Sequence, residues 1–206
     1  RGRPIILTLE QVQLLVKAAM NPKYDKLLVF VTLGLFGGLR PSEIENGLMG
    51  RSLKTAPHLK PMTWESIKLD AEDERDWVDV GGRGKQSSER YVELSPNAIS
   101  LLKFAKEKGL SVFPEKNSAN LWKALRRSIG LQGQHKWQDD IMRHTAVSYR
   151  YRCNPFTMRK GEGKRSQLSS IFGHSEYIQS THYKNAGTTM ADARAFWRIG
   201  APSWVP

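Results

Sequence analysis

The sequence predicts a mainly helical α+β domain with one small antiparallel β-sheet. Apolar residues recur at helical spacing through most of the chain, whereas only two short stretches combine β-branched and aromatic residues. The 206 residues suit one large domain with short appendages. A hydrophobic content of 39%, with 6 Trp, 7 Phe and 6 Tyr, is enough for a core and too much for a disordered chain.

The first helices follow from local signals. Thr8 with Gln11 three residues later forms a capping box, which predicts a helix that Asn21-Pro22 ends. The apolar face of that helix consists of Val12, Leu15, Val16 and Ala19. Residues 27–39 are strongly apolar and predict a buried helix, with glycines that permit close packing or a turn. A short helix is expected from Pro41, because proline suits the first helical position.

The middle of the chain contains the predicted strands. Residues 46–61 carry glycines, prolines and cations without acids, and we expect a loop there. Residues 77–80 and 90–94 are the two β-branched and aromatic stretches, and residues 81–88 read as the loop that joins them. These two strands account for the predicted sheet.

The remaining elements are helices. One is expected to start at Ser95-Pro96 and to end at Gly109, and another, capped by Asn117, reaches Ile129. Further helical stretches are predicted at residues 138–153, 167–172 and 190–197.

Charge and composition narrow the possible functions. Lys and Arg number 32 against 20 Asp and Glu, which gives a net charge of +12 and favours a polyanionic partner, most often nucleic acid. A merely soluble basic protein is the alternative. Cys153 is the only cysteine, so a reducing compartment is expected, and no apolar run approaches the roughly 20 residues of a membrane helix. We therefore expect a cytoplasmic protein without a membrane partner, associated with the nucleoid if bacterial.

Five residues along the chain carry candidate chemistry. Arg40 lies in the sequence GLRPSE, Lys85 at the tip of the loop between the strands, and Arg143 in MRHT. His174 lies in FGHS, and Tyr183 follows it nine residues later. A phenol with a pKa near ~10 is a poor nucleophile unless cations surround the place where it attacks. The question for the fold is whether it brings these cations together.

In this order, the blocks resemble those of the tyrosine recombinases, the phage-integrase family. GLRPSE resembles the block of the family's first catalytic arginine, and MRHT that of the second. The hairpin lysine stands a few residues before Arg90 and a Val-x-Leu strand, as it does in the family. FGHS with its tyrosine nine residues on is similar to the family's Leu-Gly-His block. The resemblance runs from about Thr8 to Ile199, with two departures: Asp140 stands where the family most often has histidine, and residues 46–61 read as an insertion.

The resemblance implies a site-specific DNA recombinase that works on double-stranded DNA, with no cofactor, metal, ATP or small-molecule substrate. Tyr183 would attack a phosphodiester and leave a 3′-phosphotyrosine and a free 5′-hydroxyl. Arg40 and Arg143 would grip the phosphate oxygens, because a guanidinium presents a planar fork. His174 would donate a further hydrogen bond, and Lys85 would protonate the departing 5′ oxygen.

Further residues are expected to support this site. Asp140, three residues before Arg143, is expected to orient it or to accept a hydrogen bond from Tyr183; a simple helix N-cap is an equal alternative. Glu43 is expected to position Arg40. A basic stretch is predicted to contact DNA phosphates, with a solvated surface as the alternative. Its residues are Arg150, Arg152, Lys160, Lys164 and Arg165.

The expected organisation has three parts. Residues 1–7 are expected to link to a preceding DNA-binding domain, residues 8–186 to form the catalytic domain, and residues 187–206 to form a helix and tail. That last part would dock on a neighbouring protomer, so that a tetramer assembles on DNA, or it would pack against its own core. Two other functions stay open: a type IB topoisomerase that nicks and reseals DNA, and a DNA-binding module that no longer cleaves.

Overall fold

The computed structural model describes residues 5–45, 62–69, 75–81, 90–114, 116–131, 137–138, 140–159 and 187–200. Its α-helices are α1 (Leu9–Met20), α2 (Leu28–Leu35), α3 (Pro41–Glu45), α4 (Pro96–Glu107), α5 (Ser118–Ser128), α6 (Ile141–Arg152) and α9 (Met190–Phe196). The strands are β1 (Ile67–Lys68), β2 (Trp77–Asp79) and β3 (Tyr91–Glu93), and two 3₁₀ turns lie at Asp25–Leu27 and Trp64–Ser66. The predicted fold class is confirmed.

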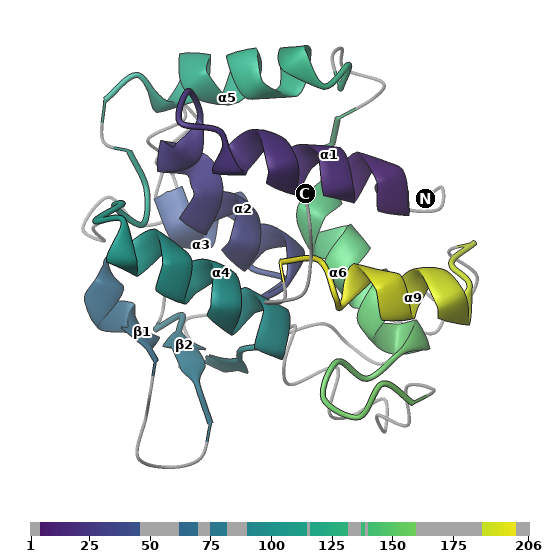
Figure 1. Ribbon diagram of the computed structural model, residues 1–206. Helices are drawn as coiled ribbons and strands as arrows, with labels where there is room; N and C mark the ends of the chain where they lie inside the picture. Colours follow the sequence, from purple (N-terminus) through teal and green to yellow (C-terminus); the bar gives the residue numbers. More distant parts are fainter. Residues whose placement is uncertain are drawn as a thin grey trace.

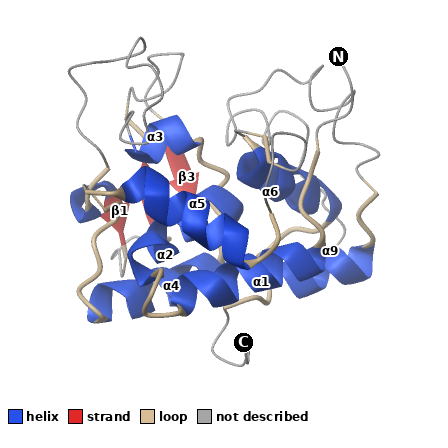
Figure 2. Ribbon diagram, turned by 90° about the horizontal axis from the view of Figure 1, so that it is seen from above, coloured by secondary structure: helices blue, strands red, loops and turns tan. Residues whose placement is uncertain are grey.

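Helix α2 forms the centre of the core. All eight of its residues are buried, because α1, α4 and α6 pack around it. Figure 1 shows α5 lying across α1 on the far side from α4. Seen from above, the strands and α3 lie to one side of the molecule, and α6 and α9 lie to the other (Figure 2).

The end of α2 determines where the following arginine lies. The prediction extended this helix to residue 39, but it ends at Leu35, because Gly38 adopts a left-handed backbone with φ of 64°. The Leu39 amide then bonds back to the Leu33 carbonyl at 3.2 Å, which turns the chain. Arg40 follows that turn, and α3 begins at Pro41 as predicted.

The sheet has the order β1-β2-β3 and is antiparallel throughout. Val78 of β2 pairs with Ile67 on one side and with Val92 on the other, and all three are buried on the inner face. A bond from the Val80 amide to the Arg90 carbonyl, at 2.8 Å, adds a rung after β2. The two predicted strands are confirmed. Strand β1 was not predicted, since two residues after a 3₁₀ turn are too few for a detectable alternation.

Local signals placed the starts of α1, α3 and α4, but they were less accurate for the cap of α5 and the start of α6. At α1, the Gln11 amide donates to Thr8 Oγ1 at 3.2 Å and the Thr8 amide to Gln11 Oε1 at 2.9 Å, so the capping box is confirmed. Asn117 stands before α5 as expected, but it has a φ of 58° and makes no capping bond; its side chain accepts from Asn120 instead. Helix α6 starts three residues later than predicted, at Ile141. The predicted loop at 46–61 and helix at 167–172 lie outside the described residues.

The last helix packs against the chain's own core. Phe196 stacks on Tyr149 of α6 with ring centroids 4.2 Å apart, and Trp197 Nε1 donates to the Cys153 carbonyl at 3.1 Å. Asn97 of α4 donates to the Ile199 carbonyl at 3.1 Å. Of the two alternatives from the sequence, packing in cis is therefore the one seen for residues 190–199. Residues 201–206 lie outside the described part, and docking of the tail on a neighbour stays a prediction.

Within the described ranges, no helix combines the length and apolarity that crossing a membrane requires.

Candidate functional site

A buried carboxylate stands at the centre of the candidate site. The side chain of Glu43 on α3 is only 2% exposed, yet three arginines approach it. Arg90 Nη2 donates to Oε2 at 2.7 Å, Arg40 Nη1 donates to Oε1 at 3.1 Å, and Arg143 Nη1 lies 4.0 Å from Oε2. A buried ion is tolerated only with such compensation. We call Arg40, Glu43, Arg90 and Arg143 the Glu43 cluster.

The start of α3 explains how Arg40 and Glu43 meet. Arg40 directly precedes the helix, Pro41 is its first residue, and Glu43 is its third. The Arg40 amide donates to Glu43 Oε2 at 2.8 Å, the backbone half of a capping box, in which an acidic side chain at the third position reaches back. This contact is consistent with the expectation that Glu43 positions Arg40.

Arg143 enters the cluster from the first turn of α6. Its side chain is fully buried, and its Nη1 donates to the Gly38 carbonyl at 2.7 Å, from a segment 105 residues away in sequence. Burial, followed by the charge of Arg40, lowers the pKa of Arg143 to about 10, so the guanidinium remains protonated at neutral pH. Arg40 is more open, with 22% of its side chain exposed.

Asp140 lies next to the cluster but does not cap α6. It occupies the N-cap position, and its side chain makes no capping hydrogen bond. Its Oδ2 lies 3.9 Å from Arg40 Nε, and its charge raises the pKa of Arg143 against the larger lowering effects. A hydrogen-bonding N-cap is therefore excluded, while a direct role toward Arg143 or Tyr183 stays a prediction.

Charges in the described part of the site sum to a positive value. Three guanidiniums stand against the two carboxylates of Glu43 and Asp140, and the most exposed guanidinium is that of Arg40. Among the residues that the structure describes, no group of His, Cys, Asp or Glu is arranged to hold a metal ion. The arrangement suits recognition of an anion such as phosphate.

The structure thus brings together Arg40, Glu43, Asp140 and Arg143 among the predicted site residues. Lys85, His174 and Tyr183 lie outside the described residues. So do three members of the predicted basic stretch, Lys160, Lys164 and Arg165.

The two remaining members of that stretch differ from one another. Arg150 is buried, with its guanidinium 5.3 Å from the centre of the Phe156 ring, and burial lowers its pKa. Phe156, whose ring lies beneath this guanidinium, is 41% exposed, and the contact of Arg150 with a DNA phosphate stays a prediction. Arg152 is half-buried, and its contact with DNA stays a prediction.

Arg90 was missed as a site residue. In the sequence, Arg90 served only to locate the hairpin lysine relative to the following strand. In the structure its side chain is 12% exposed and makes the 2.7 Å ion pair with Glu43. A signal was present: Arg90, Val92 and Leu94 alternate along β3 and the residues on either side of it, and the two apolar members are buried. A cation on an inward-facing position of a strand requires a buried partner.

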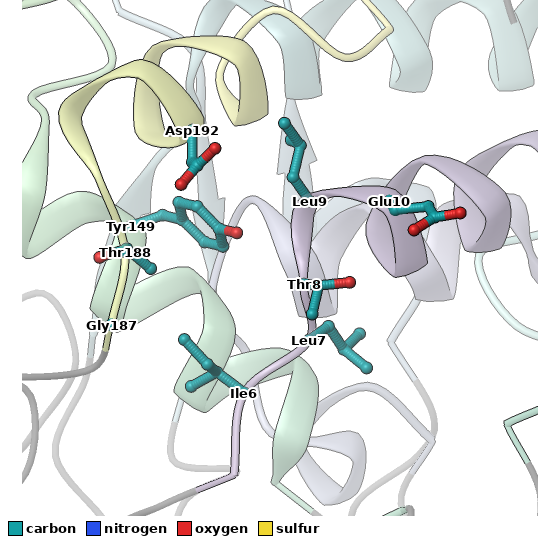
Figure 3. Close-up of a pocket in the computed structure, with 9 residues that line it drawn as sticks. All are labelled: Ile6, Leu7, Thr8, Leu9, Glu10, Tyr149, Gly187, Thr188 and Asp192. Carbon is teal, nitrogen blue, oxygen red and sulfur yellow. The ribbon is translucent and has the colours of Figure 1, made fainter.

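A hollow that shares no lining residue with the Glu43 cluster lies where the starts of α1 and α9 meet α6. It has a volume of about 380 Å³, and Figure 3 shows the Tyr149 ring beside Asp192 at its wall. Burial, followed by the charge of Asp192, raises the pKa of Tyr149 to about 12. Among the described residues that line it, the ionisable ones are Tyr149, Glu10 and Asp192; none of them is a cation, which disfavours a phosphate there.

No protein-family model matches the sequence, and no curated protein matches it either. Among solved structures, the fold is similar to that of the crystal structure of XerA recombinase, with a TM-score of 0.57. That likeness covers 99% of this chain and 68% of the other, at 15% sequence identity. At this identity the comparison shows the fold, a mainly helical domain with a small antiparallel sheet, while the function has to be argued from the residues.

Proposed function

We propose that this chain is a DNA strand transferase of the tyrosine recombinase type, which cleaves and rejoins DNA through a phosphotyrosine. One observation carries the proposal: the two arginine blocks that resemble the family's meet in space. Arg143 donates to the Gly38 carbonyl, and both Arg143 and Arg40 approach Glu43. The likeness of the fold to XerA recombinase supports the same class.

In the proposed reaction, the phenol of Tyr183 gives up its proton to solvent as its oxygen attacks the phosphorus, and the bond to the 5′ oxygen breaks. Lys85 gives a proton to the departing 5′ oxygen, which leaves as a hydroxyl. The phosphodiester energy is kept in the tyrosyl link, so rejoining needs no ATP. Positioning and charge neutralisation are the protein's main tasks in phosphoryl transfer. Arg40, the more exposed guanidinium, and His174 contact the non-bridging oxygens. The buried guanidinium of Arg143 adds positive charge to the site.

The proposed partner is double-stranded DNA, which the net charge of +12 favours. Arg152, Lys160, Lys164 and Arg165 are proposed to contact its phosphates beside the site. Residues 8–186 would form the catalytic domain, residues 1–7 a linker, and the tail after residue 200 a contact in a tetramer on DNA.

A suicide substrate with a nick near the cleavage site tests the proposal. The chain should form a covalent protein–DNA adduct, and the Tyr183→Phe variant should form none. Tyr91→Phe is a matched control, since Tyr91 is 55% exposed on the sheet and distant in sequence from the proposed nucleophile. DNA binding without any adduct would instead support the non-cleaving module, and an adduct in the Tyr183→Phe variant would exclude Tyr183 as the nucleophile.

A type IB topoisomerase is the second candidate, and the packing of α9 favours it over the first on one point. The apolar residues that would dock on a neighbour are used in cis, where Phe196 and Trp197 are buried against α6 and Phe36. Incubation with supercoiled plasmids carrying two copies of a cleaved site separates the candidates. Recombinant products indicate a recombinase, whereas relaxation without recombinants indicates a topoisomerase.

A further inference from the structure

We propose that Arg90 is a positioning residue: it holds the Glu43 carboxylate and through it fixes the guanidinium of Arg40 for phosphate. This inference rests on the proposed function and deepens it. It arises from contacts in the sheet and α3 that the sequence did not indicate.

The contact between Arg90 and Glu43 is short and shielded from water. At 2.7 Å it is the shortest of the ion pairs that Glu43 makes with described residues, and the two side chains are 12% and 2% exposed. Charge-assisted hydrogen bonds of this length are strong, and exclusion of water strengthens them further. A surface pair of the same kind contributes little.

The backbone of Arg90 is fixed independently of its side chain. Its carbonyl accepts from the Val80 amide at 2.8 Å, and Val92 of β3 and Leu94 after it are both buried. The guanidinium therefore reaches Glu43 from a sheet, while Arg143 reaches it from α6. A carboxylate that is held from rigid elements has one orientation. The Arg40 guanidinium that is paired with it is thereby held in one position.

Removal of Arg90 would change which of the remaining arginines pairs with each oxygen of Glu43. Glu43 Oε2 would keep the Arg40 amide at 2.8 Å, and Arg143 Nη1 lies 4.0 Å from the same oxygen. If Arg143 closed that gap, it would draw away from the Gly38 carbonyl, to which it now donates at 2.7 Å. The ion pair between Arg90 and Glu43 thus preserves the hydrogen bond from Arg143 to the Gly38 carbonyl. It also leaves Glu43 Oε1 available to accept from Arg40.

The experiment compares Arg90→Gln and Arg90→Lys in the full chain. The single-turnover rate of adduct formation should fall by roughly 10²-fold in Arg90→Gln, the scale expected for misplaced reacting groups. Arg90→Lys should recover part of the rate, because an ammonium supplies one charge-assisted bond but no fork. DNA affinity should change less than about threefold, since Arg90 is not proposed to touch DNA. The matched control is Arg75→Gln, whose pair with Glu93 on the same sheet is 3.6 Å long and whose side chain is 74% exposed.

A double-mutant cycle shows whether Arg90 acts through Glu43. Arg90→Gln should slow the reaction when Glu43 is present. In the Glu43→Gln background it should have almost no further effect, because the effects of mutating two coupled residues are not additive. Independent, additive losses would overturn the inference, as would a wild-type rate in Arg90→Gln. Thermal unfolding of each variant is measured first, and rates are compared below the lowest transition, so a merely structural role would not change them.

A readout independent of cleavage separates this inference from the proposed function. The NMR signals of the Arg40 and Arg143 side-chain N–H groups should shift in Arg90→Gln and stay in place in Arg75→Gln. If the wild-type chain forms no adduct, the proposed function fails, and these shifts still decide whether Arg90 orders the cluster. Unchanged signals in Arg90→Gln would overturn the inference whatever the activity.

Discussion

The two ends of α6 bury ionisable groups with opposite outcomes. Arg143, in the first turn, is fully buried and keeps its charge at neutral pH, although burial lowers its pKa to about 10. Tyr149, near the other end, is 2% exposed and stays neutral, because burial raises its pKa to about 12. In both cases burial disfavours the charged form.

The difference lies in what surrounds each group. Arg143 meets the Gly38 carbonyl and the Glu43 carboxylate, which compensate for lost hydration. Tyr149 meets the flat ring of Phe196, which favours an uncharged phenol. One helix thus connects an electrostatic site to an apolar core, and a tyrosine in that core is unsuited to attack a phosphate.

Glu43→Ala should give the largest effect. It removes the compensating charge from a buried cluster, and breaking a buried pair costs about 3–5 kcal/mol. Urea unfolding should show this loss, and adduct formation should fall with it. The control is Glu93→Ala, which removes the partially exposed partner of Arg75 and should change stability by less than about 1 kcal/mol. A stability equal to that of the wild type would mean that the cluster needs no carboxylate.

Phe196→Leu should act on stability alone. The substitution leaves a gap against Tyr149 and Phe36, and we expect a loss of about 2 kcal/mol of unfolding free energy. The single-turnover rate, measured well below the unfolding transition, should stay within about twofold of wild type because the cluster is untouched. A large fall in rate at full folding would show that the two ends of α6 are coupled.

Asp140→Asn should have a smaller effect on stability. Asp140 is 38% exposed and its oxygen lies 3.9 Å from Arg40 Nε, so the pair should contribute less than about 1 kcal/mol. The cleavage rate should fall, at most by about tenfold, as Arg40 loses one constraint. An unchanged rate would remove Asp140 from the mechanism.

Tyr149→Phe should change how stability depends on pH between pH 10 and 12. The unfolded Tyr149 loses its proton near pH ~10 but the folded one only near 12, so its stabilising contribution is present below pH 10 and lost above it. For Arg143 the folded pKa is the lower one, so its destabilising contribution fades as pH rises above 10. In Tyr149→Phe the falling contribution is absent, and urea unfolding should show its stability rising relative to wild type across that window. Parallel curves for the two proteins would contradict the raised pKa.

What the sequence predicted depends on how far apart the interacting residues are. The capping box of Thr8 and Gln11 spans three residues and was predicted in full. The pair between Arg90 and Glu43 spans 47 residues and depends on how the sheet meets α3, so a local pattern could show that Arg90 needs a buried partner but not that this partner is Glu43. Arg40 and Arg143 were identified through a family resemblance, which already contains long-range information.

Two local errors have physical causes. Residues 36–39 remained apolar past the end of α2, so hydrophobicity alone could not place the end that Gly38 creates. Asn117 occupies the predicted cap position with a left-handed backbone, which directs its side chain to Asn120 and not to the helix amides.

The Asn97 amide also bears on how the protein completes its folding during synthesis. Its buried Nδ2 finds its acceptor at Ile199, 102 residues later, and the ring of Tyr149 is covered only once Phe196 arrives. A nascent chain that has emerged only as far as α6 therefore exposes an aromatic face to solvent and leaves this amide without that acceptor. This face is completed only when α9 and Ile199 have left the ribosome, and until then it exposes apolar surface of the kind that chaperones bind.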